Sequence, residues 1–364
     1  MAKSNNYCII MAGGTGTRFW PMSRAARPKQ FLDIFGKGKS FLRTTFYRFA
    51  HIIPIENILV VTSSQYAELV RDQLPQLPEE NLLLEPYKRN TAPCIAYAAY
   101  KIRKKNPDAT VVVTPSDHLI FGEENFMDTI RCALDGAASI DSIFTIGIEP
   151  TRPDTNYGYI QINTENQIDL GGHFAYGVKT FTEKPNPDLA KVFKESEEFL
   201  WNSGMFISNV RTLIAEFEKC LQSVATVFAA GESVYYTADE AAFIKNAYCN
   251  CENISMDYGV MEKTDRVSVI KADFGWSDVG TWTSVYEHAN LKETNAVKAS
   301  ESVITDVRNS LIDEENTAKL IVVRGLDGYI VVDTPDVLMI CPKDDRIVKD
   351  TVTDLSLKEK NKYL

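Results

Sequence analysis

The sequence predicts an α/β protein with a Rossmann-like, mostly parallel sheet that helices cover on both faces, followed by a small all-β C-terminal module. Three observations predict this fold. Up to about residue 150, short apolar runs rich in β-branched residues alternate with segments of helical spacing, as in parallel strands buried between helices. From residue 151 to about 290, strands and helices mix. After residue 295, short apolar runs are separated by turns rich in Gly, Asp and Pro.

The first 150 residues supply the alternating part of this pattern. We expect strands at residues 7–11, 58–61, 110–113 and 143–146. Apolar residues recur at helical spacing in the segments between them, and we expect helices at 41–53, 91–105 and 123–138. In parallel sheets of this kind ligands bind beyond the carboxyl ends of the strands, so this edge is the predicted place for a site.

The pattern of expected secondary structure changes near residue 290. Before that point we expect strands at 157–160 and 179–185 and helices at 187–198 and 213–221. After it, strand-like runs follow one another at 302–304, 320–323, 329–332 and 337–340. The sequence therefore predicts two domains, at residues 1–290 and 291–364.

Composition argues against several classes of protein. The 364 residues carry a formal charge of −10, which argues against general binding to nucleic acid or to anionic membranes. No apolar run approaches the roughly 18 residues of a membrane-spanning helix, and the N-terminus lacks a signal-peptide core. We therefore expect a cytoplasmic protein, in which the seven cysteines are reduced thiols.

A glycine-rich stretch follows the first expected strand: residues 12–31 read AGGTGTRFWPMSRAARPKQF. Its three clustered glycines remove side chains where the strand ends, so that backbone N–H groups can close on an anion. Arg18 and Lys29 add positive charge, and the first 32 residues contain no Asp or Glu. A plain turn is the alternative, and the stretch lacks the spacing of the Walker A and dinucleotide-binding motifs. We interpret it as a polyphosphate cradle.

This stretch resembles the signature of the sugar-nucleotide pyrophosphorylases, a family of nucleotidyltransferases. The match is G-G-x-G-x-R followed eleven residues later by Pro-Lys, and the FWPMS and PKQF segments are similar to the branch that uses GTP and mannose 1-phosphate. The resemblance covers about residues 5–290. It implies a nucleotide-binding half at 1–150 and a sugar-phosphate-binding half at 151–290. It also implies catalytic roles for Arg18 and Lys29, and nucleotide binding by Gly13, Gly14 and Gly16.

Asp117 and Asp278 are the candidate metal ligands. Asp117 follows an apolar strand, and Asp278 lies in the Gly- and Trp-rich segment FGWSDVGTW. Either aspartate could instead cap a helix or a turn. Mg²⁺ commonly binds one or two carboxylates together with substrate phosphates, and the resemblance gives both aspartates this role. We therefore expect Mg²⁺ or Mn²⁺ here, with both residues counted as catalytic.

Three further motifs are candidates for the sugar side of the site. FTEKP places Glu183 next to Lys184, and by pattern alone it could be an exposed strand corner. The resemblance assigns Glu183 to sugar hydroxyls and Lys184 to the sugar phosphate. WNSGMF and YGYI match further family motifs and add Asn202, Gly204 and Gly158.

The motif RNTAP at residues 89–93 precedes an expected helix, so Asn90 or Thr91 could serve as its N-cap. The resemblance places this motif beside the nucleobase, which makes Asn90, Thr91 and Pro93 the base-binding candidates. DYGVME at residues 257–262 also matches a family block, and no contact is assigned to it.

These parts together predict the transfer of GMP from GTP to mannose 1-phosphate. A phosphate oxygen of the sugar would attack the α-phosphorus in line and pyrophosphate would leave, so no protein nucleophile is required. A pyrophosphorylase for another pair of sugar 1-phosphate and nucleoside triphosphate is one alternative. A non-catalytic subunit that binds sugar nucleotides is another. Exposed β edges in the C-terminal module leave room for a homodimer.

Overall fold

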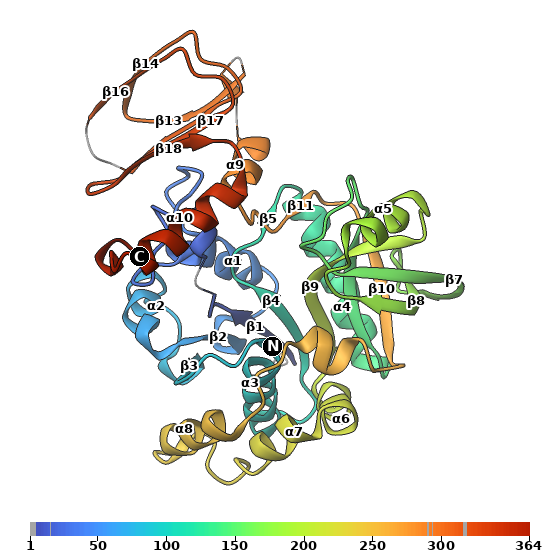
Figure 1. The fold of residues 1–364 in the computed structure, drawn as a ribbon. Coiled ribbons are helices and arrows are strands. Elements are labelled where there is room, and N and C mark those ends of the chain that lie inside the picture. The colour runs from blue at the N-terminus through green and yellow to red at the C-terminus, as the bar shows by residue number, and fades with distance from the viewer. Residues whose placement is uncertain (1–4, 15, 290, 293, 316–318) are drawn as a thin grey trace. The chain divides into compact units, whose positions relative to one another are not determined.

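The computed structural model describes residues 5–14, 16–289, 291–292, 294–315 and 319–364 (Figure 1). The chain divides into two compact units. The first consists of Met1–Gly13, Thr45–Ser116 and Ile120–Ser277, and the second of Gly14–Thr44, Asp117–Leu119 and Asp278–Leu364. Each unit consists of three separate stretches of the chain, whereas the sequence-based prediction divides the chain at a single position. The predicted boundary at residue 290 stays a prediction.

The first unit is built on a large sheet with the strand order β3-β2-β1-β4-β9-β6-β10-β8-β7. Its strands are β1 (Asn6–Met11), β2 (Ile58–Ser63), β3 (Leu82–Glu85), β4 (Thr110–Pro115), β6 (Ile143–Ile148), β7 (Tyr159–Asp169), β8 (Phe174–Thr182), β9 (Phe199–Asn209) and β10 (Val267–Ala272). β1 pairs in parallel with β2 and β4, and β6 pairs in parallel with β10. β9 runs antiparallel between β4 and β6. Two short strands, β5 (Leu119–Ile120) and β11 (Trp276–Ser277), complete the list up to residue 277.

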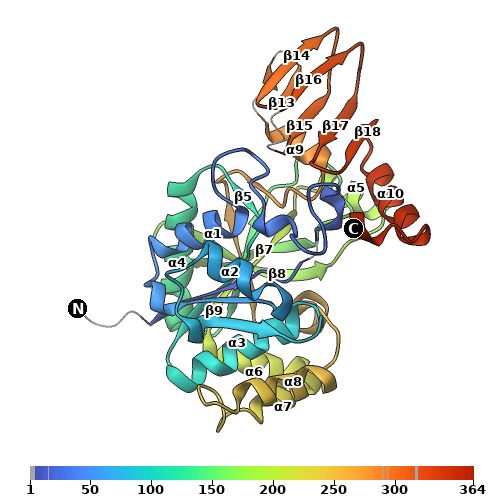
Figure 2. The same ribbon diagram turned by 90° about the vertical axis from the view of Figure 1, so that its left-hand side faces the viewer.

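Helices cover both faces of this sheet. They are α1 (Phe41–Ala50), α2 (Ala67–Gln73), α3 (Thr91–Lys105), α4 (Glu123–Ser139), α5 (Pro187–Glu195), α6 (Val210–Cys220), α7 (Gln222–Ala229) and α8 (Glu240–Asn250). Figure 2 shows α3, α6, α7 and α8 gathered together, and Val111 and Val113 of β4 belong to the apolar core that these helices share. Because side chains alternate along a strand, the buried Val112 faces the other side, where α4 packs on β4. The predicted fold class is confirmed.

The second unit contains the C-terminal strands β12 (Leu291–Lys292), β13 (Asn295–Lys298), β14 (Glu301–Thr305), β15 (Leu311–Glu314), β16 (Leu320–Arg324), β17 (Tyr329–Asp333) and β18 (Leu338–Pro342). β13, β15 and β17 lie side by side in parallel, and so do β14 and β16. The chain therefore alternates between two small sheets as it winds through this segment (Figure 2). Ile312, Val323 and Val331 fill the space between them.

The remaining elements of the second unit are α9 (Trp282–His288), α10 (Asp345–Leu357) and the loop from Gly14 to Ser40. Aromatic residues of that loop, such as Phe19 and Trp20, share one apolar core with α9 and with Ile330 and Val332 of β17. The predicted C-terminal strands are confirmed, and helix α10 follows them. Among the described residues, no helix has both the length and the apolar character needed to cross a membrane.

Candidate active site

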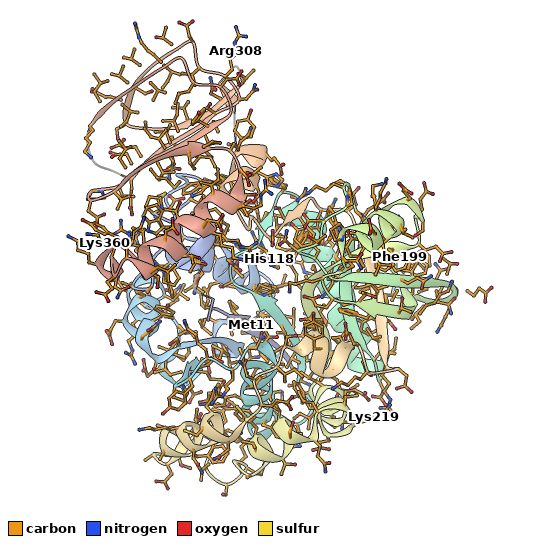
Figure 3. The ribbon with its side chains drawn as sticks, viewed as in Figure 1. Met11, His118, Phe199, Lys219, Arg308 and Lys360 are labelled. Carbon is orange, nitrogen blue, oxygen red and sulfur yellow. The ribbon has the colours of Figure 1, made fainter. Side chains whose placement is uncertain are left out.

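The glycine-rich loop begins after Met11, the last residue of β1, which is labelled in Figure 3. Gly13 belongs to the first unit, whereas Gly14 and Gly16 belong to the second. Gly16 has φ +58°, and a Cβ there would lie 2.6 Å from Lys29 Cβ, so only glycine fits this position. The carbonyl oxygen of Gly14 accepts a hydrogen bond from Gln30 Nε2 at 2.9 Å. Thr15 lies outside the described residues.

Lys29 brings the two candidate metal ligands together within the second unit. Its Nζ lies 3.0 Å from Asp117 Oδ2 and donates to the carbonyl oxygens of Asp117 at 3.0 Å and Asp278 at 2.6 Å. The ammonium also lies over the rings of Phe19 and Phe41, at 5.5 and 5.0 Å. The Lys29 side chain is only 5% exposed. A buried ammonium with these partners fixes the Asp117 carboxylate and the backbone of both aspartates.

Arg18 and the Asp278 carboxylate both lie close to Gly280. A Cβ on Gly280 would lie 3.2 Å from Arg18 Nη1 and 3.2 Å from Asp278 Oδ2, so both charged groups flank this glycine. The Gly280 N–H donates to Asp278 Oδ1 at 3.1 Å. Arg18 is exposed and has no hydrogen bond or ion pair with any residue that the structure describes. Its guanidinium is therefore available to an anionic ligand beside Asp278.

Backbone strain marks the same turn. Val279, between Asp278 and Gly280, has φ +43°, a conformation that is unfavourable for a β-branched residue. Its side chain is buried in the apolar core of the second unit. That core therefore holds the turn in a conformation that presents the neighbouring aspartate.

The charges of the site favour an ionised Asp117. Burial raises the pKa of its carboxyl, but the Lys29 ammonium, together with His118, outweighs this and leaves the pKa below its usual value. Within the described part of the chain, no group of three or more His, Cys, Asp or Glu side chains could hold a metal. Asp117 and Asp278 offer two carboxylates, the number that Mg²⁺ commonly uses when it also binds substrate phosphates.

The sugar-side candidates gather in the first unit. Glu183 and Lys184 follow β8 and form an ion pair, and the Glu183 N–H donates to Glu262 Oε1 at 3.1 Å. Burial lowers the pKa of the Lys184 ammonium, but Glu183 and Asp257 outweigh it, so the net pKa is raised. A Cβ on Gly158 would overlap the Glu183 carboxylate. Glycine at position 158 therefore makes room for this carboxylate.

Asn202 in β9 is held in one orientation. Its Oδ1 accepts from Thr145 Oγ1 at 3.2 Å and from the Gly204 N–H at 3.1 Å. Its Nδ2 donates to Asp257 Oδ1 at 2.9 Å. Burial, followed by the nearby Glu183 charge, raises the pKa of Asp257 to about 6. Asp257 thus joins the cluster, a contact that the motif DYGVME did not reveal by itself.

The base-binding candidates lie at the start of α3, also in the first unit. Asn90 is exposed, and its Oδ1 accepts the Thr91 N–H at 3.0 Å, so it caps the helix. Thr91 Oγ1 accepts the Met256 N–H at 2.8 Å, and Pro93 is buried in the first turn. Asn90 has φ +66°. The capping role is therefore present, and base binding stays a prediction for all three residues.

Sequence reasoning missed Glu85, which ends β3 at the same edge of the sheet. Its carboxylate accepts a hydrogen bond from Tyr248 Oη at 3.0 Å, and its Oε2 lies 3.0 Å from where a Cβ on Gly13 would be. Burial raises the pKa of Glu85 to about 7. A buried carboxylate beside the glycine-rich loop is a candidate for recognising a ligand that carries N–H groups.

Comparison with known proteins decides the family. Residues 7–295 match the family described as nucleotidyl transferase. The chain belongs to the nucleotidyl transferase family. The predicted enzyme class, a nucleotidyltransferase, is thereby confirmed.

Relatives of this nucleotidyltransferase agree over nearly the whole chain. The mannose-1-phosphate guanylyltransferase of Klebsiella pneumoniae is 34% identical, over 98% of this chain and 75% of that protein. The alginate biosynthesis protein AlgA of Pseudomonas aeruginosa is 34% identical, over 95% and 71%. A crystal structure titled mannose-1-phosphate geranyltransferase, from Thermus thermophilus, superposes with a TM-score of 0.85 at 29% identity, covering 97% of this chain and all of that one.

Proposed function

We propose that this nucleotidyltransferase transfers GMP from GTP to mannose 1-phosphate, giving GDP-mannose and pyrophosphate. The observation that carries the proposal is the contact of the buried Lys29 ammonium with both Asp117 and Asp278. It holds the Asp117 carboxylate and the backbone of Asp278 near an exposed arginine that is unpaired among the described residues, and a metal-bound triphosphate needs carboxylates and a cation of this kind. The names of the relatives, among them a mannose-1-phosphate guanylyltransferase, support GTP and mannose 1-phosphate as the substrates.

In the second unit the roles follow from charge and reach. Asp117 and Asp278 would hold a divalent cation, Mg²⁺ or Mn²⁺, which when bound would supply positive charge to phosphate oxygens. Arg18 would bind the triphosphate directly, while Gly14 and Gly16 let backbone N–H groups approach it. Lys29 already contacts three oxygen acceptors. We therefore assign it first to holding the aspartates, with phosphate binding as a role that requires it to release one acceptor.

In the first unit the proposed roles concern the sugar and the base. Glu183, Asn202 and Asp257 would bind sugar hydroxyls, and the Lys184 ammonium would bind the sugar phosphate. Gly158 and Gly204 let these groups approach closely. Glu85 would accept hydrogen bonds from the ring N–H and the amino group of guanine. Gly13, Asn90, Thr91 and Pro93 would line the nucleotide.

The chemistry needs positioning and charge stabilisation. A phosphate oxygen of mannose 1-phosphate attacks the α-phosphorus of GTP and forms the new P–O bond. The bond from the α-phosphorus to the bridging oxygen breaks, and pyrophosphate leaves with that electron pair. No protein side chain becomes covalently bound, so the rate depends on how well cations stabilise the phosphoryl oxygens.

The test is a substrate matrix. Purified protein is incubated with Mg²⁺, with GTP, ATP, dTTP or UTP, and with mannose 1-phosphate or glucose 1-phosphate. Pyrophosphate release and the mass of the sugar nucleotide are then measured. We expect the GTP and mannose 1-phosphate pair to give the highest kcat/KM. Preference for another pair would assign the chain to a different pyrophosphorylase activity, and no transfer with any pair would favour the non-catalytic subunit.

Location and assembly stay predictions. We expect a cytoplasmic protein without nucleic-acid or membrane partners, and we retain the homodimer as an expectation. Sedimentation of the purified protein at micromolar concentration would separate a monomer from a dimer.

A further inference from the structure

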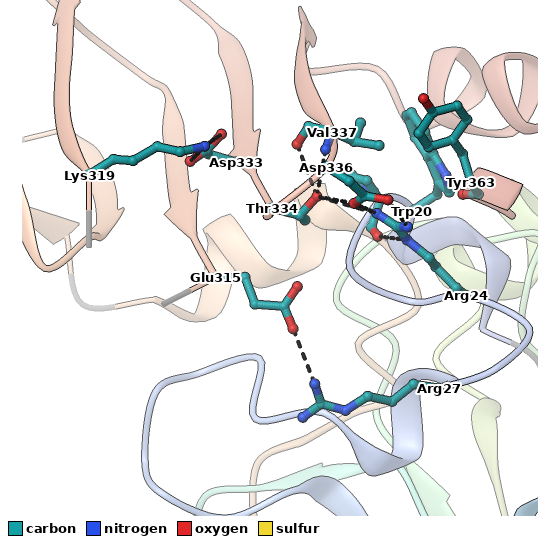
Figure 4. A network of polar contacts seen from close by, with 11 residues as sticks. Trp20, Arg24, Arg27, Glu315, Lys319, Asp333, Thr334, Asp336, Val337 and Tyr363 are labelled. Atoms are coloured by element: carbon teal, nitrogen blue, oxygen red, sulfur yellow. Dashed lines mark hydrogen bonds and ion pairs between the residues drawn. The ribbon is translucent and has the colours of Figure 1, made fainter. Parts of the chain in front are cut away.

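The loop that carries Arg18 and Lys29 is fastened to the C-terminal part of the second unit (Figure 4). Arg24 Nη1 donates to Asp336 Oδ2 at 2.7 Å, and Arg24 Nη2 donates to Asp336 Oδ1 at 2.5 Å. This is the two-pronged geometry in which arginine binds a carboxylate most strongly. The Nε of Arg24 also donates to the Pro21 carbonyl at 2.9 Å, so the same guanidinium holds the loop and the strand segment.

Two further contacts fasten the loop. Trp20 Nε1 donates to the carbonyl oxygen of Tyr363 at 2.7 Å, and Arg27 forms an ion pair with Glu315 at 3.2 Å. Figure 4 shows that these partners come from separate parts of the C-terminal segment. The family model ends at residue 295, so all of them lie beyond the matched region.

The partner of Arg24 is itself held in place. Asp336 lies in the turn between β17 and β18, where the Thr334 hydroxyl accepts the Val337 N–H at 3.1 Å and Thr334 is buried. The Arg24 guanidinium is the largest of the causes that lower the pKa of Asp336 to about 2. The carboxylate is therefore ionised and fixed at the point where the loop meets it.

The loop has little regular structure of its own. Between Gly14 and Ser40 the described residues form two 3₁₀ turns, Thr17–Phe19 and Lys29–Phe31, and an isolated bridge between Arg24 and Arg27. Such a segment takes its conformation from its side-chain contacts. Arg24 lies six residues after Arg18 and five before Lys29. The position of Arg24 therefore bears on the backbone that leads to both flanking cations.

We propose that the C-terminal strand segment is a brace for the triphosphate-binding loop, and that Arg24 and Asp336 are positioning residues for Arg18 and Lys29. Neither positioning residue contacts the substrate. Because the loop is assigned to the triphosphate, this inference rests on the proposed function. It adds that residues beyond 295 determine how well GTP is bound and turned over.

The test compares Arg24→Ala, Asp336→Ala and the double variant with Lys319→Ala. The control removes the ion pair of Lys319 with Asp333, at 3.0 Å in the same segment, and leaves the loop contacts in place (Figure 4). We expect each single variant of the brace to lose roughly 10- to 100-fold in kcat/KM for GTP, with the KM for mannose 1-phosphate unchanged. The double variant should be no worse than either single one, because the two residues act as a pair. Lys319→Ala should stay within twofold of wild type.

Hydrogen exchange supplies a readout that does not depend on activity. In the unliganded protein, Arg24→Ala should accelerate amide exchange in residues 18–29, and Lys319→Ala should not. If Arg24→Ala fails to fold, Arg24→Lys replaces it in this experiment, because lysine keeps the positive charge but cannot form the paired hydrogen bonds of the guanidinium with Asp336. Unchanged exchange in residues 18–29 would overturn the brace, even in a protein without transferase activity. So would additive losses in the double variant, or GTP kinetics that stay at the wild-type level while thermal stability falls.

Discussion

Replacing Lys29 by methionine tests whether its ammonium both stabilises the second unit and supports catalysis. The substitution keeps the apolar stem between Phe19 and Phe41 and removes the ammonium that lies 3.0 Å from Asp117 Oδ2. At that distance two charges attract by about 5 kcal/mol in a medium of effective dielectric constant about 20. Removing one partner of a buried pair costs about 3–5 kcal/mol, because the other charge is left without compensation.

We expect the lower end of that range, a loss of about 3 kcal/mol in the free energy of unfolding, because the Asp117 side chain is 33% exposed and water can reach it. The double variant Lys29→Met/Asp117→Asn removes both charges and should recover part of this loss. It should not recover activity. Both variants should lose roughly 10²–10³-fold in kcat.

The pH dependence of this loss follows from the lowered pKa of Asp117. A carboxyl whose folded pKa lies below its unfolded value contributes stability above the unfolded pKa of about 4, and this contribution is lost as the pH falls through the folded pKa. Lys29→Met removes the ammonium that lowers this pKa, and burial, the largest single influence, continues to raise it. The stability difference between wild type and Lys29→Met should therefore be largest near pH 7 and shrink below about pH 4.

Denaturant unfolding at several pH values measures this stability, with Lys37→Met as the control because Lys37 is an exposed lysine of the same loop. Pyrophosphate release measures the activity. The reasoning is refuted if the free energy of unfolding of Lys29→Met equals that of Lys37→Met. It is also refuted if the double variant Lys29→Met/Asp117→Asn is no more stable than Lys29→Met. Near-normal turnover by Lys29→Met would remove the residue from the proposed chemistry.

Three further substitutions probe separate parts of the proposed site. Gly280→Ala places a methyl group 3.2 Å from two charged side chains and should lower kcat/KM for GTP roughly tenfold; wild-type kinetics would contradict the assigned geometry. Glu85→Gln should reduce the preference for GTP over ATP in competition assays, and unchanged selectivity would exclude Glu85 from base recognition. Because burial raises the folded pKa of Glu85 to about 7, wild type loses stability between about pH 4.5 and pH 7, so the glutamine variant should gain relative stability over this interval in denaturant unfolding. Asp257→Asn replaces the carboxylate that accepts a hydrogen bond from Asn202 Nδ2 by an amide. It should raise the KM for mannose 1-phosphate about tenfold and leave the KM for GTP unchanged. Initial-rate kinetics with each substrate varied would measure both KM values.

Much of the fold could be predicted because local signals agree with tertiary packing. The helix expected at 91–105 is α3 with the same bounds, since Asn90 caps its start and its apolar residues all face the core. The start of α6 was expected three residues late, because its N-cap, Asn209, lies at the end of a buried strand. The helix α10 was not predicted. Its apolar residues are spread among charges, and its signal is the cap at Asp344.

The sequence indicated which residues belong to the candidate site, but it did not indicate most of the contacts between them. Glycines, charges and their spacing indicated which residues matter, but Lys29 meets Asp117 and Asp278 across 88 and 249 positions of the chain. Nothing near Lys29 in sequence indicates that its ammonium is buried. Glu85 and Asp257 were missed or left without a role for the same reason, since their burial comes from distant residues such as Tyr248 and Asn202.

The most direct measurement is the rate of GDP-mannose formation by wild type, Asp278→Asn and Asp273→Asn, each with saturating Mg²⁺. Asp273 is an exposed aspartate five residues earlier in the chain, so its variant controls for the loss of a nearby negative charge. The account predicts a rate roughly 10²–10³-fold lower for Asp278→Asn and a wild-type rate for Asp273→Asn. Equal rates for all three proteins would contradict it.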